Sequence, residues 1–109
     1  MKVYHTLDLG EYCNICGVND NSPLKIARTT TDKVLDNERL HSHLKGFEYY
    51  LIMQGALRMR VGASTLELKA GDMLQVDPGE PHKVEEVLQR CDYVVVNTNP
   101  DPLDRIVLE

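Results

Sequence analysis

Residues 41–55 read HSHLKGFEYYLIMQG, and this stretch decides how the chain folds. His41 and His43 lie two residues apart, so on a β-strand their side chains share one face. Glu48 follows His43 by an odd number of residues, and an unbroken strand would turn its carboxylate to the other face. The chain must therefore bend between them. Gly46 is the expected bending point because glycine adopts backbone angles that other residues avoid.

A second stretch, residues 71–82, reads GDMLQVDPGEPH and ends on another histidine. Its Pro-Gly-Glu-Pro turn ends an apolar segment and fixes where the next strand begins, so the position of His82 is rigid. Together the two stretches offer three imidazoles and one carboxylate, a set of ligands that suits a divalent transition metal. The predicted metal ligands are His41, His43, Glu48 and His82.

The predicted ligand set leaves room in the coordination sphere. Four protein ligands leave one or two positions open on a metal that prefers five or six, and water, substrate or oxygen can occupy these positions. Iron, manganese or nickel suits this arrangement better than structural zinc, although zinc stays among the candidates.

Both stretches resemble the two sequence motifs of the cupin superfamily. The first motif has the form His-X-His, three or four residues, Glu, six residues, Gly, and the second has the form Gly, five residues, Pro-X-Gly-X-X-His, three residues, Asn. The matching positions are His41, His43, Glu48 and Gly55, followed by Gly71, Gly79 and His82. Three positions depart from the family pattern, since Leu35, Asp77 and Glu86 replace its leading Gly, its first Pro and its final Asn.

The rest of the chain agrees with an all-β fold of short strands separated by turns, and no long segment has a helical period. The resemblance implies a double-stranded β-helix, a small jelly-roll barrel, as a single domain over residues 1–109. Residues 100–109 are expected to form a tail or a final short element. The expected strands are 3–9, 24–31, 40–44, 48–54, 56–61, 65–69, 73–76, 82–87 and 92–98.

Length and charge exclude several classes of function. A chain of 109 residues with 42% hydrophobic content can close one core but not two. Its net charge of -5 argues against nucleic acid and acidic lipid surfaces as partners. No apolar run of membrane-spanning length and no secretory signal is visible, so a cytoplasmic location is expected.

The cysteines predict no disulfide framework, because an odd number of three in a chain without a secretion signal indicates reduced thiols. Cys13 and Cys16 have the spacing of metal knuckles and redox pairs, but only Cys91 or His5 could complete a zinc site. A small buried pair at a loop edge is therefore the favoured interpretation. His5 is expected at a solvent or edge position.

Residues 49–53 and 93–96 are apolar on both faces, which indicates that both faces are covered. A homodimer would cover the second face, and it would also stabilise a barrel of this size. Alternatively, the two sheets of one barrel bury both faces without a partner.

Two residues are candidates for acid, base or substrate contacts. If Glu48 faces the metal, strand alternation also turns Tyr50 inward, either as a hydrogen-bond donor to substrate or as a ring that fills the barrel. The same alternation from His82 sends Glu86 inward, to the mouth of the barrel. Asn97 and Tyr93 share a face of the last strong strand and could reach the same cavity.

Arg58 and Arg60 share a face of their strand. They are either a solvated pair or a binding site for a carboxylate or phosphate group.

Fold and metal do not define a reaction. The first hypothesis is a metalloenzyme acting on a small polar organic molecule, of the dioxygenase, isomerase or lyase type, and the resemblance does not choose among these. A non-enzymatic cupin that binds or senses a small-molecule ligand through its metal is the main alternative. A barrel that serves only as an assembly module is a third.

Overall fold

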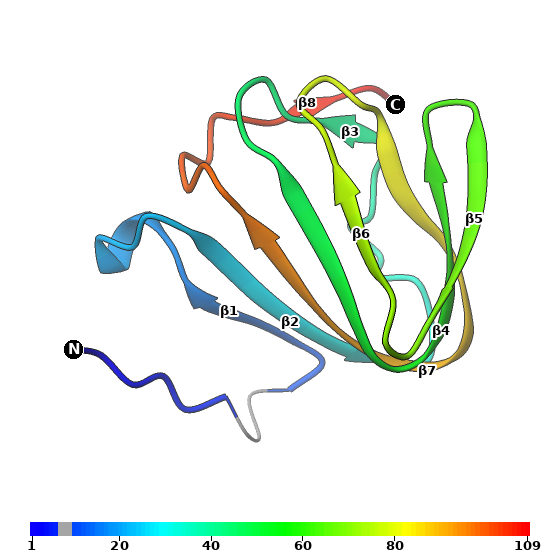
Figure 1. The fold of residues 1–109 in the computed structure, drawn as a ribbon, viewed down its shortest axis with the longest axis horizontal. Helices are drawn as coiled ribbons and strands as arrows, with labels where there is room; N and C mark the ends of the chain where they lie inside the picture. The colour runs from blue at the N-terminus through cyan, green and yellow to red at the C-terminus, as the bar shows by residue number, and fades with distance from the viewer. Residues whose placement is uncertain (7–9) are drawn as a thin grey trace.

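In the computed structural model, which describes residues 1–6 and 10–109, the strands form one sheet that curls over on itself (Figure 1). The all-β, jelly-roll fold predicted from the sequence is confirmed. The strands are β1 (Tyr12–Cys16), β2 (Lys25–Thr31), β3 (His41–Ser42), β4 (Glu48–Val61), β5 (Ser64–Lys69), β6 (Met73–Val76), β7 (His82–Asn97) and β8 (Ile106–Val107).

The two longest strands, β4 and β7, run antiparallel and organise the whole sheet. The first half of β4 pairs with β6 and with the second half of β7, which also pairs with β2. The second half of β4 pairs with β5 and with the first half of β7. Strands β3 and β8 close the end of the sheet where β7 begins. Each long strand thus crosses from one half of the barrel to the other.

Gly55 marks the crossing point in β4, where the register with β7 shifts on both sides of Gln54. Its φ of 79° is in the left-handed region, and a Cβ atom there would lie 2.0 Å from the carbonyl oxygen of Arg90. Only glycine fits both demands. The register shifts make this a bulge, which does not end the strand. The expected segments 48–54 and 56–61 therefore merge into β4, and 82–87 and 92–98 merge into β7.

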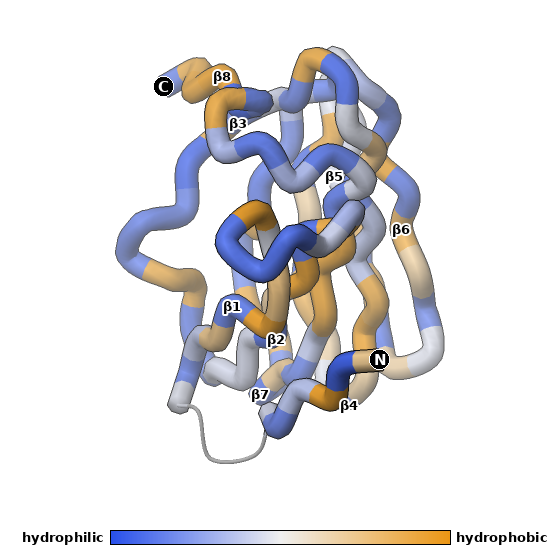
Figure 2. The backbone as a smooth tube through the Cα atoms, turned by 90° about the vertical axis from the view of Figure 1, so that its left-hand side faces the viewer, coloured by the Kyte–Doolittle hydropathy of each residue, from blue (hydrophilic) through white to orange (hydrophobic). Residues whose placement is uncertain are grey.

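The core lies on the inner face of the curled sheet. Hydrophobic and hydrophilic residues interleave along the strands (Figure 2). Alternation turns one set of side chains inward, where they pack together. This buried set comprises Tyr50, Ile52, Leu57, Met59, Leu68, Val76, Val84, Cys91 and Tyr93. The predicted inward orientation of Tyr50 is therefore confirmed.

The N-terminal part differs most from the expectation. Residues 3–6 form no strand, and the remainder of the expected strand, residues 7–9, lies outside the described residues. The first strand is β1 instead, so Cys13 and Cys16 belong to a strand paired with β2 and not to a loop edge. At the other end, the expected final short element is β8.

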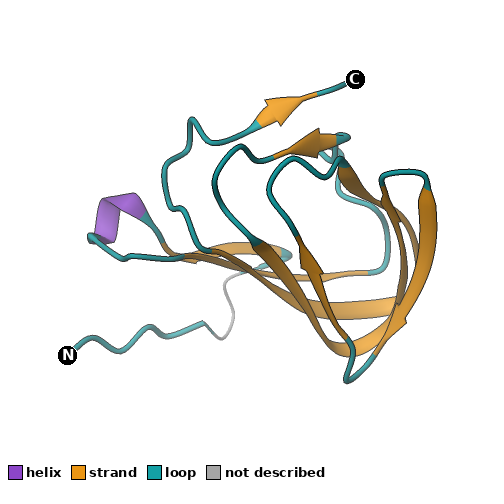
Figure 3. Ribbon diagram, turned by 45° about the horizontal axis from the view of Figure 1, so that its top comes forward, coloured by secondary structure: helices purple, strands orange, loops and turns teal. Residues whose placement is uncertain are grey.

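Figure 3 shows a single helical turn, η1 (Val18–Asp20), between β1 and β2. Over residues 1–6 and 10–109, the structure has no helix with the length and apolar character needed to cross a membrane.

The outer face of the β4–β6 pair is apolar and exposed. Leu51 and Met73 are paired across the two strands and are 36% and 62% exposed, and Met53 is 53% exposed. The inner neighbours Tyr50 and Ile52 are buried, so a single chain covers only one face of this segment. The homodimer stays a prediction, and the mass of the protein by light scattering tests it.

Candidate metal centre

Four buried side chains from three strands and one loop meet at the closed end of the inner face. His41 in β3 lies directly across from His82, the first residue of β7. His43 follows β3, and Glu48 opens β4. One ligand atom of each residue lies within 4.8 Å of the corresponding atoms of the other three. The residues that the sequence predicts as metal ligands are thus brought together as a cluster that can hold an ion.

Each imidazole is oriented by a backbone carbonyl group. The Nδ1 atoms lie at hydrogen-bond distance from the carbonyl oxygens of Arg39 (2.7 Å from His41), Asp104 (2.6 Å from His43) and Glu80 (2.9 Å from His82). Because a carbonyl oxygen only accepts, each Nδ1 atom carries the proton and donates it. The lone pairs of the three Nε2 atoms are left to bind a metal, an arrangement typical of histidine ligands.

The chemistry of the donor set fits a divalent cation. The Nε2 atoms of His43 and His82 are buried and have no hydrogen-bond partner among residues 1–6 and 10–109. They lie 2.5 Å and 3.5 Å from the carboxylate oxygens of Glu48, whose Oε2 atom also accepts a hydrogen bond of 3.2 Å from Asn97. Buried acceptors that face one another in this way repel. A divalent metal bound by them would offset this repulsion.

Electrostatics keep His41 and Glu48 in the forms that bind metals. Burial lowers the pKa of His41 to about 4, so its imidazole is neutral at pH 7. Burial alone would raise the pKa of Glu48, but His43 and His82 more than offset this and hold it well below its usual range. At pH 7 the cluster therefore offers a neutral imidazole and an ionised carboxylate.

The bend between His43 and Glu48 is confirmed, but the reason for Gly46 is different from the predicted one. Its φ is not in the left-handed region. Instead, a Cβ atom at this position would lie 2.4 Å from Oδ1 of Asn97. Glycine is required there because the loop packs closely against the end of β7.

Asp104 holds this loop, and the sequence analysis did not identify it. Its carboxylate accepts hydrogen bonds from the backbone N–H groups of Leu44, Lys45 and Gly46, at 2.7, 3.0 and 2.8 Å. Burial raises the pKa of Asp104, but these hydrogen bonds more than offset it, and the pKa falls below its usual value. No local pattern marks this aspartate, because the groups it binds are about sixty residues away in the chain.

The match to known families agrees with this geometry. Residues 35–96, more than half of the chain, match the model of the cupin domain family. The chain is a cupin. A protein described as uncharacterized, MJ1618 from Methanocaldococcus jannaschii, is 35% identical to this cupin over 48 residues. That match covers 44% of this chain and 38% of the archaeal protein, so it spans less than half the length of either.

Several solved structures share the fold. Pac13, a nucleoside dehydratase from Streptomyces, has a TM-score of 0.75 at 12% identity over 100% of this chain and 92% of its own. Oxalate decarboxylase from Bacillus subtilis has a TM-score of 0.70 at 15% identity over 85% of this chain and 26% of its own. KdgF from Halomonas sp. has a TM-score of 0.65 at 12% identity, over 94% and 92% respectively. At these identities the likeness shows the fold alone.

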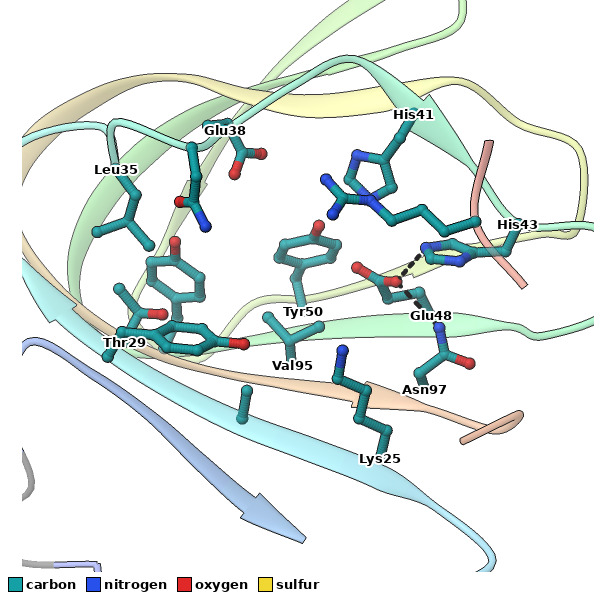
Figure 4. A pocket seen from close by; sticks show the side chains of 15 residues that line it. Lys25, Thr29, Leu35, Glu38, His41, His43, Glu48, Tyr50, Val95 and Asn97 are labelled. Carbon is teal, nitrogen blue, oxygen red and sulfur yellow. Dashed lines mark hydrogen bonds and ion pairs between the residues drawn. The ribbon is translucent and has the colours of Figure 1, made fainter. Parts of the chain in front are cut away.

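A cavity of about 160 Å³ opens from the metal cluster along the inner face of this cupin (Figure 4). Tyr50, Tyr93 and Asn97 line it, as their inward orientation allows. Burial, followed by the nearby Glu48 carboxylate, raises the pKa of Tyr50 well above its ordinary value. Its phenol therefore keeps its proton and can donate a hydrogen bond. Its ring also belongs to the core, so both interpretations of Tyr50 apply.

Glu86 does not point into the cavity, and its predicted inward orientation is wrong. In the ladder between β4 and β7, Arg58 pairs with Glu86 but Met59 pairs with Val84, so the register shifts by one residue. This bulge reverses the alternation beyond Val84. Glu86 is consequently exposed and makes an ion pair with Arg58 on the outer face.

The arginine pair is also external. Besides Glu86, Arg58 binds Glu67 of β5 at 3.2 Å, so carboxylates of the chain itself already occupy its guanidinium. Arg60 is exposed, and its Nε atom lies 3.4 Å from the carbonyl oxygen of Gly62. The interpretation as a solvated pair fits this arrangement, and the anion-binding one does not.

Three charged residues line the cavity although no sequence pattern indicated them: Glu38, Lys25 and Arg105. Glu38 precedes β3, and its Oε1 atom accepts a hydrogen bond of 2.9 Å from the N–H group of Val84. Burial raises the pKa of its carboxyl group. Figure 4 shows this carboxyl group directed into the cavity from the side opposite Thr29.

The remaining candidates lie outside the cluster. Cys13, Cys16 and Cys91 are free thiols, and Cys16 and Cys91 are buried. No cysteine joins the group of metal-capable side chains found in the described part of the chain. His5 is exposed, as the sequence predicts.

Proposed function

We propose that this cupin is a metal-dependent enzyme that acts on a small polar organic molecule. The ion would be held by His41, His43, Glu48 and His82. The observation that carries the proposal is the pair of buried Nε2 atoms, of His43 and His82, that face the Glu48 carboxylate without a hydrogen-bond partner. When bound, the ion would polarise a carbonyl, enolate or hydroxyl oxygen of the substrate.

Two cavity residues have properties suited to proton transfer and orientation. Glu38 replaces Glu86 as the candidate general acid or base, because its raised pKa brings it closer to the range where a carboxyl group exchanges protons readily. Tyr50 keeps its proton and is placed to donate a hydrogen bond to a substrate oxygen. The apolar side chains of Leu35 and Val95 help to exclude water from the same space.

The structural neighbours support a catalytic role at the level of the fold. A nucleoside dehydratase and an oxalate decarboxylase are built on the same architecture, so this barrel hosts lyase chemistry elsewhere. The proposed activity is of the dioxygenase, isomerase or lyase type. A non-enzymatic metal-anchored sensor would use the same four ligands.

Metal content tests the proposal directly. The protein is purified without a chelating tag, and its iron, manganese, nickel and zinc are measured by mass spectrometry. About one equivalent of a transition metal is expected in the wild type and in His5→Gln, a control at an exposed histidine. The His41→Gln and His82→Gln variants should lose it. A wild type that binds none of these metals, or a double variant that keeps its metal, would overturn the proposal.

Activity is then tested on the metal-loaded protein by oxygen uptake and with a panel of keto acids and sugar acids. Glu38→Gln and Tyr50→Phe should each lower kcat by about 100-fold or more while metal content stays unchanged. Tight metal-dependent binding without turnover would instead assign the sensor function.

A further inference from the structure

A row of polar side chains crosses the inner face at the level of the four predicted metal ligands. Lys25 of β2 pairs with Asn97 of β7, and Asn97 pairs with Glu48 of β4. Adjacent strands lie about 4.8 Å apart, so Lys25 stands on the same face as Glu48 at roughly 10 Å along the row. Figure 4 shows the ammonium end of Lys25 directed into the cavity beside Val95. The register thus aims a cation at the space next to the metal cluster.

Arg105, which lines the same cavity, supplies a second cation. It directly follows Asp104, whose carboxylate is fixed by the loop amides, and it directly precedes β8, which pairs with β3. Its backbone is therefore held on both sides. Arg105 lines the cavity together with His41. Burial is the main influence on the pKa of both His41 and Glu38 and lowers that of His41 but raises that of Glu38, whereas the nearby Arg105 charge acts to lower both.

Lys25 and Arg105 differ from Arg28 and Arg58 in having no carboxylate partner among the described residues. Arg28 binds Asp92, and Arg58 binds Glu67 and Glu86. Neither Lys25 nor Arg105 forms an ion pair within 4.0 Å with any residue that the structure describes. Glu38 lines the same cavity, but its Oε1 atom already accepts the N–H group of Val84. The cavity therefore presents two cations that are free to bind an anion.

The size of the cavity limits what that anion can be. A volume of about 160 Å³ corresponds to roughly five water molecules at about 30 Å³ each. This suits a ligand of roughly half a dozen non-hydrogen atoms. The planar fork of an arginine matches the two oxygens of a carboxylate, and the lysine adds a point charge.

We propose that the ligand of this cupin is a small hydroxy or keto carboxylic acid, whose carboxylate binds Arg105 and Lys25 while its other oxygen faces His41, His43, Glu48 and His82. This inference rests on the proposed function and adds the substrate class to it. Arg105 and Lys25 determine specificity for the charged end.

Isothermal titration of the metal-loaded protein tests this with pairs of probes that differ only in charge: 3-hydroxybutyrate against 3-hydroxybutyramide, and lactate against lactamide. At least one acid should bind about tenfold or more tightly than its neutral amide. Arg105→Gln should weaken binding of that acid by about 10- to 100-fold, because a charge-assisted pair of hydrogen bonds is lost. Lys25→Gln should weaken it by a smaller factor. The control Lys69→Gln, at an exposed lysine of β5 outside the cavity, should change nothing.

Metal content is measured on each sample before titration, which separates this inference from the proposed function. A protein without metal contradicts the proposed function. A protein that holds its metal but binds neither acid, or binds acid and amide equally, overturns the carboxylate assignment. Unchanged binding in the Arg105→Gln, Lys25→Gln double variant overturns it as well, and so does binding of inorganic phosphate in place of both acids.

Discussion

The two chain segments that deliver the histidines are held in opposite ways. The turn before His82 holds itself: the N–H group of Asp77 donates to Oε1 of Glu80 at 2.8 Å, and the N–H group of Glu80 donates to the carbonyl oxygen of Asp77 at 3.2 Å. The loop after His43 is held from a distance by Asp104 and by the hydroxyl group of Thr98, which accepts the N–H group of Phe47 at 2.9 Å.

This difference explains what a motif can and cannot encode. The turn carries its own hydrogen-bond partners within six residues, so its sequence is enough to predict its shape. Asp77 even uses the N–H group that the proline of the family pattern would lack. The loop takes its shape from the last part of the chain. The two segments then meet, because the N–H group of Gly79 donates to the carbonyl oxygen of His43 at 2.7 Å.

The largest expected effect comes from replacing the distant carboxylate. In Asp104→Asn the side chain loses its charge and one acceptor, and a buried N–H group of the loop loses its partner. The free energy of unfolding should fall by about 3 kcal/mol. Metal affinity should fall by about tenfold or more, because Asp104 also places the carbonyl group that orients His43. Denaturant unfolding and metal titration measure the two quantities.

Glu80→Gln is the matched variant in the local turn. It keeps an acceptor for the N–H group of Asp77 in an exposed setting, so the cost should be about 0.5 kcal/mol. Equal losses in Asp104→Asn and Glu80→Gln would show that the two segments are held alike, contrary to the structure.

Replacing one glycine in each segment tests the same difference. Gly46→Ala places a Cβ atom 2.4 Å from Oδ1 of Asn97, an atom that already accepts the N–H group of Asn99. We expect a cost of about 2 kcal/mol from this clash, with weaker metal binding because Asn97 also contacts Glu48. Gly79→Ala meets no atom within 4 Å and carries only the strain of its φ of 85°, about 1 kcal/mol. Chemical denaturation of both variants gives the order, and a costlier Gly79→Ala would contradict it.

Outside both segments, on the outer face, we expect an effect on stability alone. Asp92 accepts two hydrogen bonds from Arg28, at 2.9 and 2.7 Å, and this partly exposed pair contributes about 1 kcal/mol. Asp92→Asn should lower stability by that amount and leave metal affinity unchanged. It therefore controls for a general loss of stability in Asp104→Asn.

The Arg28 contact holds the pKa of Asp92 below its usual value, so the sign of the pH dependence follows. A lowered pKa in the folded state gives stability that is present above the unfolded pKa of about 3.9 and is lost as pH falls through the folded pKa. The stability difference between the wild type and Asp92→Asn should be constant near neutral pH and shrink below about pH 4. A difference that grows on acidification would contradict this origin.

Much of the fold and the set of candidate ligands could be predicted because they depend on local rules. Period-two alternation predicted that Tyr50 points inward, and the parity of His43 and Glu48 required a bend. The same rule failed for Glu86, because a bulge between β4 and β7 inserts one residue and reverses the faces. Bulges depend on the pairing of two strands, so one strand read alone does not reveal them.

By itself, the sequence determined that the chain is a β-rich cupin and which four side chains gather at its inner face, since spacing and alternation act over a few residues. Only the tertiary structure decided what surrounds them. Asp104 fixes the loop, Glu38 enters the cavity, and Lys25 and Arg105 place two cations at its walls. These residues reach the cluster because strand pairing brings together segments that lie far apart in the sequence. Their positions follow from how the sheet closes and not from their neighbours in the chain.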